Sequence, residues 1–282
     1  MRKYISMLLI VILFQAGIYL YLDRVILVPS AKFSQQAIID KNIRSLDPKK
    51  VSTDQKYYVK LQTVGVMFYS ADNQLKQQYT LKQGERVSYF SWVPKTEIAL
   101  VGITSNRAGG ATVTLKSINL ETNSHPVEPK ISGLPSGSKI VEVAFAPQIN
   151  VTYMLVKENN FNAIYRTDAN NNLRLLLHSA SVQRIAALQS EDRLIYDNNP
   201  KGVIYALTKG VRKILSPSIG QYVLIGTDKD NNIYIGQLSA PGVVSTILKG
   251  TINGDFKKFK TLNFVYPVAS ITVNNDGKLR LM

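Results

Sequence analysis

The run IVEVAFAP at residues 140–147 is a strand-like segment that is closely matched by VSYFSWVP at residues 87–94. Both runs are rich in β-branched and aromatic residues, and both end in proline. A third copy, without the proline, starts at Ile185. Each copy is followed by a second apolar segment, at residues 98–103, 151–156 and 194–196. The repeat predicts successive pairs of neighbouring β-strands.

Turn-forming residues separate the apolar segments from Tyr57 onward. The turns lie at residues 71–74, 168–172, 228–232 and 274–277, and an apolar residue follows each of them: Leu75, Leu173, Ile233 and Leu279. Asn, Asp and Gly accept the positive φ that tight hairpins require. Apolar and polar residues alternate, as in YVKLQ at residues 58–62, and no amphipathic helix is evident after residue 57. We therefore predict an all-β head over residues 57–282.

Two short strings resemble known propeller blades. IGTDKDNNIYI at residues 225–235 resembles the inner hairpin of NHL-type blades, and FAP at residues 145–147 resembles the Phe-Ser-Pro of TolB-like and WD40-like blades. The proline-ended copies lie 53 residues apart, near the repeat of about 40 to 50 residues that is typical of a blade. The resemblance implies a radial array of about five or six four-stranded blades, used mainly for binding. The Gly-His and Trp-Asp pairs of WD40 repeats are absent. A β-sandwich is the alternative architecture.

The N-terminus carries a membrane-anchor pattern. Ile5 to Leu22 is an uncharged stretch of 18 residues, preceded by Arg2 and Lys3. As a helix it would span roughly 27 Å, close to the thickness of a bilayer core. The basic pair favours a cytoplasmic N-terminus and therefore an extracytoplasmic head. A cleaved signal peptide is the alternative, although the best small-residue site contains Pro29.

The chain then divides into three parts. Residues 1–28 are predicted to form the cytoplasmic tip and transmembrane signal-anchor helix, residues 29–56 a polar stalk with a short helix at 34–46, and residues 57–282 the propeller-like head. The chain has no cysteine, so disulfides, thiol nucleophiles and cysteine-ligated metals are excluded. An exported domain without disulfides fits a bacterial cell envelope.

The charge of the chain suggests a class of partner. The formal net charge is +15, and the head alone has 25 basic and 15 acidic residues. Such a charge favours anionic partners. Two basic clusters form the candidate binding surface: Lys209, Arg212 and Lys213, and Lys257, Lys258 and Lys260. The alternative is that these residues only keep the surface soluble.

No catalytic or metal-binding constellation is recognisable. His125 and His178 are the two histidines, and nothing in the sequence pairs them with a ligand or nucleophile. Asp228, Asp230 and Asn232 have the alternation of a calcium loop, but Ile233 occupies the glycine position, so a hairpin turn is the preferred interpretation. We expect no cofactor.

These observations lead to a functional hypothesis. We expect a membrane-tethered, extracytoplasmic propeller that binds a protein or an anionic polymer of the cell envelope and is not an enzyme. Its membrane contact would be Ile5 to Leu22, and a head outside the cytoplasm is not expected to bind nucleic acid. The alternatives are a sensory or assembly subunit of an envelope complex, and an enzyme whose site is assembled from distant loops. Carboxylates or histidines gathered at the centre of the propeller would favour the enzyme.

Overall fold

The computed structural model describes Gln15 and residues 50–107, 109–122 and 128–281. The predicted anchor at residues 5–22, apart from Gln15, and the predicted stalk helix lie outside these residues. Within the described part of the chain, no helix is long and apolar enough to cross a membrane. The described residues from 50 onward divide into two compact units: a larger one within residues 61–66 and 79–281, and a smaller one of residues 50–60 and 67–78.

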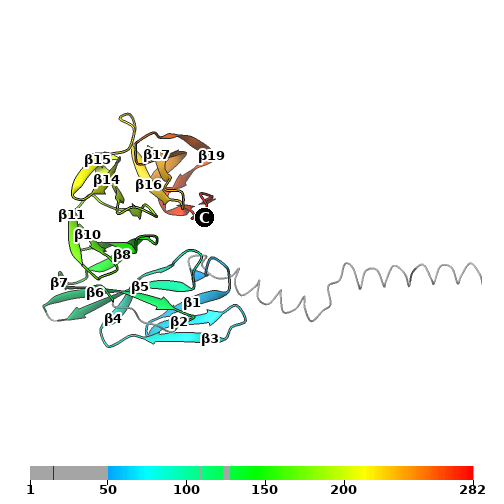
Figure 1. Ribbon diagram of the computed structural model, residues 1–282, viewed down its shortest axis with the longest axis vertical. Helices are drawn as coiled ribbons and strands as arrows, with labels where there is room; N and C mark the ends of the chain where they lie inside the picture. Colours follow the sequence, from blue (N-terminus) through cyan, green and yellow to red (C-terminus); the bar gives the residue numbers. More distant parts are fainter. Residues whose placement is uncertain (1–14, 16–49, 108, 123–127, 282) are drawn as a thin grey trace, which may run out of the picture. The chain divides into compact units, whose positions relative to one another are not determined.

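The larger unit contains four consecutive four-stranded sheets (Figure 1). Each is an antiparallel meander in which strands pair in chain order. The first comprises β4 (Glu85–Trp92), β5 (Ile98–Arg107), β6 (Gly110–Asn119) and β7 (Lys130–Leu134). The second comprises β8 (Lys139–Ala146), β9 (Val151–Lys157), β10 (Asn162–Thr167) and β11 (Arg174–Ser179). The third comprises β12 (Ile185–Ala187), β13 (Leu194–Asn198), β14 (Val203–Thr208) and β15 (Val211–Ile214). The fourth comprises β16 (Tyr222–Thr227), β17 (Ile233–Ala240), β18 (Val243–Gly250) and β19 (Lys257–Pro267).

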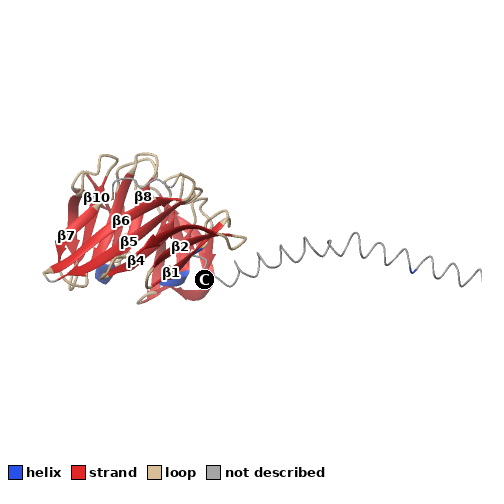
Figure 2. Cartoon of the chain, turned by 90° about the horizontal axis from the view of Figure 1, so that it is seen from below, coloured by secondary structure: helices blue, strands red, loops and turns tan. Residues whose placement is uncertain are grey.

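Shorter elements complete the structure. A two-stranded sheet is formed by β20 (Ile271–Val273) and β21 (Leu279–Leu281). Most of a three-stranded sheet, β1 (Tyr57–Gln62), β2 (Gly65–Ser70) and β3 (Leu75–Thr80), belongs to the smaller unit. The 3-10 helices η3 (Asn199–Lys201) and η4 (Val268–Ser270) are single turns. Nearly all of the described chain is therefore strand or loop, as Figure 2 shows, and the predicted all-β class is confirmed.

The repeated runs of the sequence are the first strands of successive sheets. The copies at residues 87–94, 140–147 and 185–188 correspond to β4, β8 and β12, and the segments that follow them are β5, β9 and β13. The predicted turns also form, because Asn73, Asn171, Asn231 and Gly277 adopt positive φ. After these turns β3, β17 and β21 begin at the predicted residues, whereas β11 begins at Arg174, one residue later than predicted.

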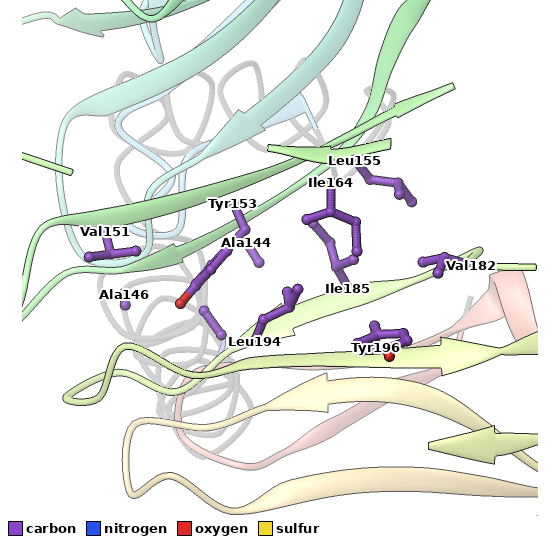
Figure 3. Close-up of a cluster of buried hydrophobic side chains, with 11 residues drawn as sticks. Ala144, Ala146, Val151, Tyr153, Leu155, Ile164, Val182, Ile185, Leu194 and Tyr196 are labelled. Atoms are coloured by element: carbon purple, nitrogen blue, oxygen red, sulfur yellow. The ribbon is translucent and has the colours of Figure 1, made fainter. Parts of the chain in front are cut away.

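Apolar side chains join each sheet to the next. Figure 3 shows one such cluster, in which Leu155 and Ile164 of the second sheet pack with Leu194 and Tyr196 of the third. Similar clusters join the first sheet to the second, the third to the fourth and the fourth to β20. Burial of a single Leu or Ile contributes about 2 kcal/mol. These clusters therefore supply most of the free energy that holds neighbouring sheets together.

The first strands of the sheets form a row inside the larger unit. β4 contacts β8, β8 contacts β12, β12 contacts β16 and β16 contacts β20. Such a row of first strands is what blades arranged around a common centre produce. The multiple four-stranded sheets are thus consistent with a propeller, while the number of blades stays a prediction.

Candidate functional site

A cavity of about 310 Å³ lies against the first four-stranded sheet, within the larger unit. Side chains from the end of β3, the start of β4, the strands β5, β6 and β7, and the segments before β4 and β7 line it. The polar and aromatic lining consists of the cations Lys82, Arg107, Lys116 and Lys130, the carboxylates Glu85 and Glu128, the hydroxyls Ser105, Thr112 and Thr114, and Tyr79. Several polar groups that converge on one cavity are typical of a ligand site. We call this feature the basic cavity.

Both carboxylates of the basic cavity are already engaged. The Lys116 ammonium lies 2.6 Å from Glu128 Oε1, and it also lies 4.6 Å from the centre of the Tyr79 ring. Glu85 Oε2 accepts a hydrogen bond of 2.8 Å from the backbone amide of Lys82. Glu128 is therefore paired with Lys116, whereas Glu85 keeps its charge, and four cations against two carboxylates leave the lining with a net charge of +2.

Three cations of the basic cavity have no acidic partner. Within the described ranges, Lys82, Arg107 and Lys130 form no ion pair. Each side chain is exposed, and they come from three separate segments of the chain. An accessible cavity with unpaired cations attracts anions and raises their local concentration. Arginine and lysine can donate several hydrogen bonds to phosphate or carboxylate oxygens.

The predicted basic residues lie on the outer strands of two neighbouring sheets. Lys209 occupies the turn before β15 with φ of 48°, and Arg212 and Lys213 lie on β15. The guanidinium of Arg212 is 5.1 Å from the centre of the Tyr205 ring. Lys213 Nζ donates to the carbonyl oxygen of Ile252 at 3.2 Å, in the turn that leads to β19. Part of this cluster therefore already has partners within the protein.

The second predicted cluster lies on β19, the fourth strand of its sheet. Lys257, Lys258 and Lys260 are exposed there. Lys257 and Lys258 line a second cavity of about 310 Å³ together with Asp255 and Phe259. The hydrogen bond from Lys213 to Ile252 joins the third sheet to the fourth, so the two clusters lie on neighbouring sheets. That they form a binding surface stays a prediction.

Two carboxylates and a guanidinium gather near the first strands, at β8, β12 and β13. Glu142 Oε2, on β8, accepts a hydrogen bond of 2.8 Å from the amide of Ile185. Asp197 Oδ1, on β13, accepts bonds of 3.0 and 2.8 Å from the amides of Gln183 and Arg184. The two carboxylates thus fix the segment that leads into β12. We call Glu142, Arg184, Asp197 and the nearby Tyr89 of β4 the inner cluster.

Burial changes the acidity of this cluster. It raises the pKa of Glu142 to about 7, against the opposing effects of the Arg184 charge and the Ile185 amide. Burial also raises the pKa of Asp197, despite the two amide hydrogen bonds. Burial likewise raises the pKa of the Tyr89 phenol to about 12. Glu142 therefore titrates near neutral pH, where general acids and bases operate.

His178 and the calcium-like loop at residues 228–232 form hydrogen bonds within the protein. His178, on β11, lies with Nε2 3.2 Å from Glu158 Oε2, while His125 lies outside the described residues. Asp228 accepts hydrogen bonds from the amides of Asp230 and Asn232 at 3.0 and 2.9 Å, as a hairpin turn requires. In the part of the chain that the structure covers, no three potential His, Cys, Asp or Glu ligands come together.

Comparisons with known proteins establish the fold. No family model and no curated protein matches the sequence. Among solved structures, an oligogalacturonate lyase in complex with manganese aligns with a TM-score of 0.57 and 9% identity, over 82% of this chain and 68% of the lyase. A streptogramin B lyase aligns with a TM-score of 0.51 and 12% identity, over 81% and 73%. A virginiamycin B lyase from Staphylococcus aureus aligns with a TM-score of 0.50 and 16% identity, over 79% and 71%.

These structures are β-propeller-like, and at such low identities they show the fold alone. They support the propeller-like interpretation over the β-sandwich. They also correct one expectation from the sequence: the hypothesis that the head is not an enzyme is contradicted at the level of the fold, because solved structures of this fold include lyases. The fold is shared by enzymes and binding proteins, so function has to be argued from the sites.

Proposed function

We propose that this chain is a membrane-tethered head outside the cytoplasm that binds an anionic polymer of the bacterial cell envelope in the basic cavity. The tether is the uncharged segment from Ile5 to Leu22, with Arg2 and Lys3 on its cytoplasmic side. The formal net charge of +15 favours accumulation near anionic polymers.

One observation carries the binding proposal: Lys82, Arg107 and Lys130 line one cavity, and none forms an ion pair within the described residues. A ligand with regularly spaced phosphates or carboxylates would pair with several of these cations at once. The hydroxyls of Thr112 and Thr114 supply further hydrogen bonds.

Binding of a simple anionic polymer tests this proposal. The full chain, purified in detergent, is titrated with poly(glycerol phosphate) and, separately, with uncharged dextran. We expect binding of the anionic polymer only, with an affinity that falls as salt is raised, because screening shortens the reach of each charge. The double variant Arg107→Gln/Lys130→Gln should bind roughly tenfold more weakly, equivalent to about 1.4 kcal/mol.

A matched control separates the cavity from overall charge. Lys139→Gln/Lys201→Gln removes the same two charges from exposed positions that do not line the basic cavity. Equal loss in both double variants would refute a dedicated site in the cavity.

The tether has an independent test. Protease added to intact spheroplasts should digest the head, and the protein should sediment with membranes. Recovery of a soluble form that begins near Ala31 would contradict the tether without affecting the cavity.

A further inference from the structure

The outer strand of the fourth sheet, β19, contains a bulge that presents two apolar side chains to solvent. Between two registered pairs of β18 and β19, β18 contributes one residue, Ser245, whereas β19 contributes four, residues 262–265. Extra residues in one strand bend it and interrupt the ladder of hydrogen bonds. On this bulge the side chain of Phe264 is 74% exposed and that of Val265 is 59% exposed.

The bulge is anchored on both sides. Leu262 at its start is 8% exposed and belongs to the apolar cluster that joins the fourth sheet to β20. Tyr266, directly after the bulge, packs against the same cluster. The exposure of Phe264 and Val265 therefore does not come from a frayed strand end, because buried side chains fix the backbone before and after them.

The same strand carries cations without acidic partners. The three lysines at positions 257, 258 and 260 are exposed, and none forms an ion pair within the described ranges. Residues 257–267 contain no Asp or Glu, and the nearest carboxylate in the sequence is Asp255. Three lysines and one aspartate leave this end of the sheet with a net charge of +2. β19 therefore combines exposed cations with exposed apolar side chains.

This combination decides which kind of partner fits. A bulge interrupts the regular edge that a strand from another protein would need for pairing. A dissolved polyanion would pair with the lysines but would leave Phe264 and Val265 in water. An anionic bilayer supplies phosphates for the lysines and an apolar layer for the two side chains, as it does for interfacial segments rich in Lys and Phe.

We propose that β19 is a membrane-contact strand: Phe264 and Val265 enter the interface of an anionic bilayer, and Lys257, Lys258 and Lys260 lie against its headgroups. The contact uses residues outside the basic cavity and does not require the proposed tether. In a tethered chain it fixes which side of the fourth sheet faces the membrane.

A fluorescent label at the bulge tests this contact. The chain has no cysteine, so Val265→Cys provides a single site for an environment-sensitive probe. The labelled full chain is reconstituted in vesicles of phosphatidylcholine, with or without phosphatidylglycerol. We expect a blue shift of the emission and quenching by nitroxide-labelled lipid only with phosphatidylglycerol, and both should weaken at high salt because screening shortens the reach of the lysine charges.

A matched label and a soluble polyanion serve as controls. Leu175→Cys places the label on β11, the outer strand of the second sheet, where the native side chain is 53% exposed. We expect no blue shift there. Poly(glycerol phosphate) added to the phosphatidylcholine vesicles should likewise leave the emission of the label at position 265 unchanged.

Further substitutions in the labelled protein separate the two contributions. Phe264→Ser should remove most of the quenching, because it replaces an apolar side chain with a polar one. Substitution of the three lysines by Gln should abolish the difference between the two lipid compositions, since each lysine near an anionic surface contributes roughly fivefold to the contact equilibrium. Vesicle flotation reports the tether separately, because a tethered chain floats with both compositions.

Three results would overturn the proposal. One is the absence of a blue shift with phosphatidylglycerol, and another is an equal shift of the label at position 175. The third is full quenching in Phe264→Ser, which would mean that no apolar insertion occurs. A shift caused by the soluble polyanion would assign β19 to the polymer instead and would equally contradict a membrane contact.

Discussion

Arg166 and Arg107 lie at the ends of β10 and β5 and have opposite surroundings. Arg166 is 8% exposed, and its Nε and Nη2 donate to Asp192 at 3.1 and 2.8 Å. Its Nη1 donates to Asp168 at 3.1 Å. Arg107 is exposed and has no ion-pair partner within the described residues. An arginine whose donors are used holds the fold, whereas one without partners is available to a ligand.

Arg166 joins two neighbouring sheets. Asp192 belongs to the turn between β12 and β13, and the Tyr153 hydroxyl of β9 donates to the same carboxylate. Burial alone would raise the pKa of Asp192, but the hydrogen bonds from Arg166 and Tyr153 outweigh it and lower the pKa. The Arg166 hydrogen bond also lowers the pKa of Asp168, to about 2. The second and third sheets are therefore linked by charge as well as by apolar packing.

Removal of Arg166 should have the largest effect. We expect Arg166→Ala to lower the free energy of unfolding by about 3 kcal/mol, because it leaves the Asp192 and Asp168 carboxylates without their cationic partner. Arg107→Ala should change it by less than about 0.5 kcal/mol, as an exposed side chain with no such role. Denaturant unfolding of the full chain in detergent measures both. Similar values for the two variants would remove the distinction between structural and available arginines.

A substitution at Gly277 tests a second structural contact, the hydrogen bond between Tyr234 and Asp228. Asp228 Oδ2 accepts a hydrogen bond of 2.9 Å from the Tyr234 hydroxyl, and a Cβ at Gly277 would lie 2.6 Å from that hydroxyl oxygen. Gly277→Val should therefore break this bond and also strain a backbone with φ of 75°. We expect a loss of about 2 kcal/mol in the free energy of unfolding.

Gly210 provides the matched control for backbone strain. Its φ is 84°, and a Cβ there would have no neighbour within 4 Å. Gly210→Val keeps the backbone strain without the clash, so it should cost about 1 kcal/mol. If both valine variants lose the same stability, the Tyr234–Asp228 bond contributes little.

The fold was largely predictable because its determinants are local. A β-branched run followed by a turn with Asn, Asp or Gly defines a hairpin without reference to the rest of the chain. The first strands β4, β8 and β12 were visible in this way, as were the starts of β3, β17 and β21. The number of blades is not local, because it depends on how distant sheets meet.

The sites were less predictable, since whether a charged side chain is free to bind a ligand depends on its neighbours in the tertiary structure. Nothing near Arg107 or Lys130 in the sequence says that Glu128 pairs with Lys116, or that these two cations have no acidic partner within the described residues. Lys213 carried a predicted binding role, yet its ammonium donates to the carbonyl of Ile252. One signal was present: Glu142 is the only charged residue in the run at 140–147. A lone carboxylate in an inner strand indicates a buried acid, and this is where the inner cluster lies.

The smallest expected effect concerns the lysines of β19. In their availability to a ligand they are intermediate between Arg166, whose donors are used, and Arg107, which has no ion-pair partner within the described residues. Lys257, Lys258 and Lys260 are exposed like Arg107, but they lie on an outer strand, and Asp255 lines the same cavity as Lys257 and Lys258. Reversal of all three to Glu should weaken poly(glycerol phosphate) binding by roughly threefold at 0.1 M salt, where a Debye length of about 10 Å leaves only near charges effective. Reversal of the exposed Lys139, Lys157 and Lys201, away from both cavities, should cost less. The two triple variants change the net charge equally, so binding titrations of the full chain compare position alone. An equal loss would mean that the β19 lysines only contribute to overall charge, and binding that is insensitive to salt would exclude an electrostatic role for them.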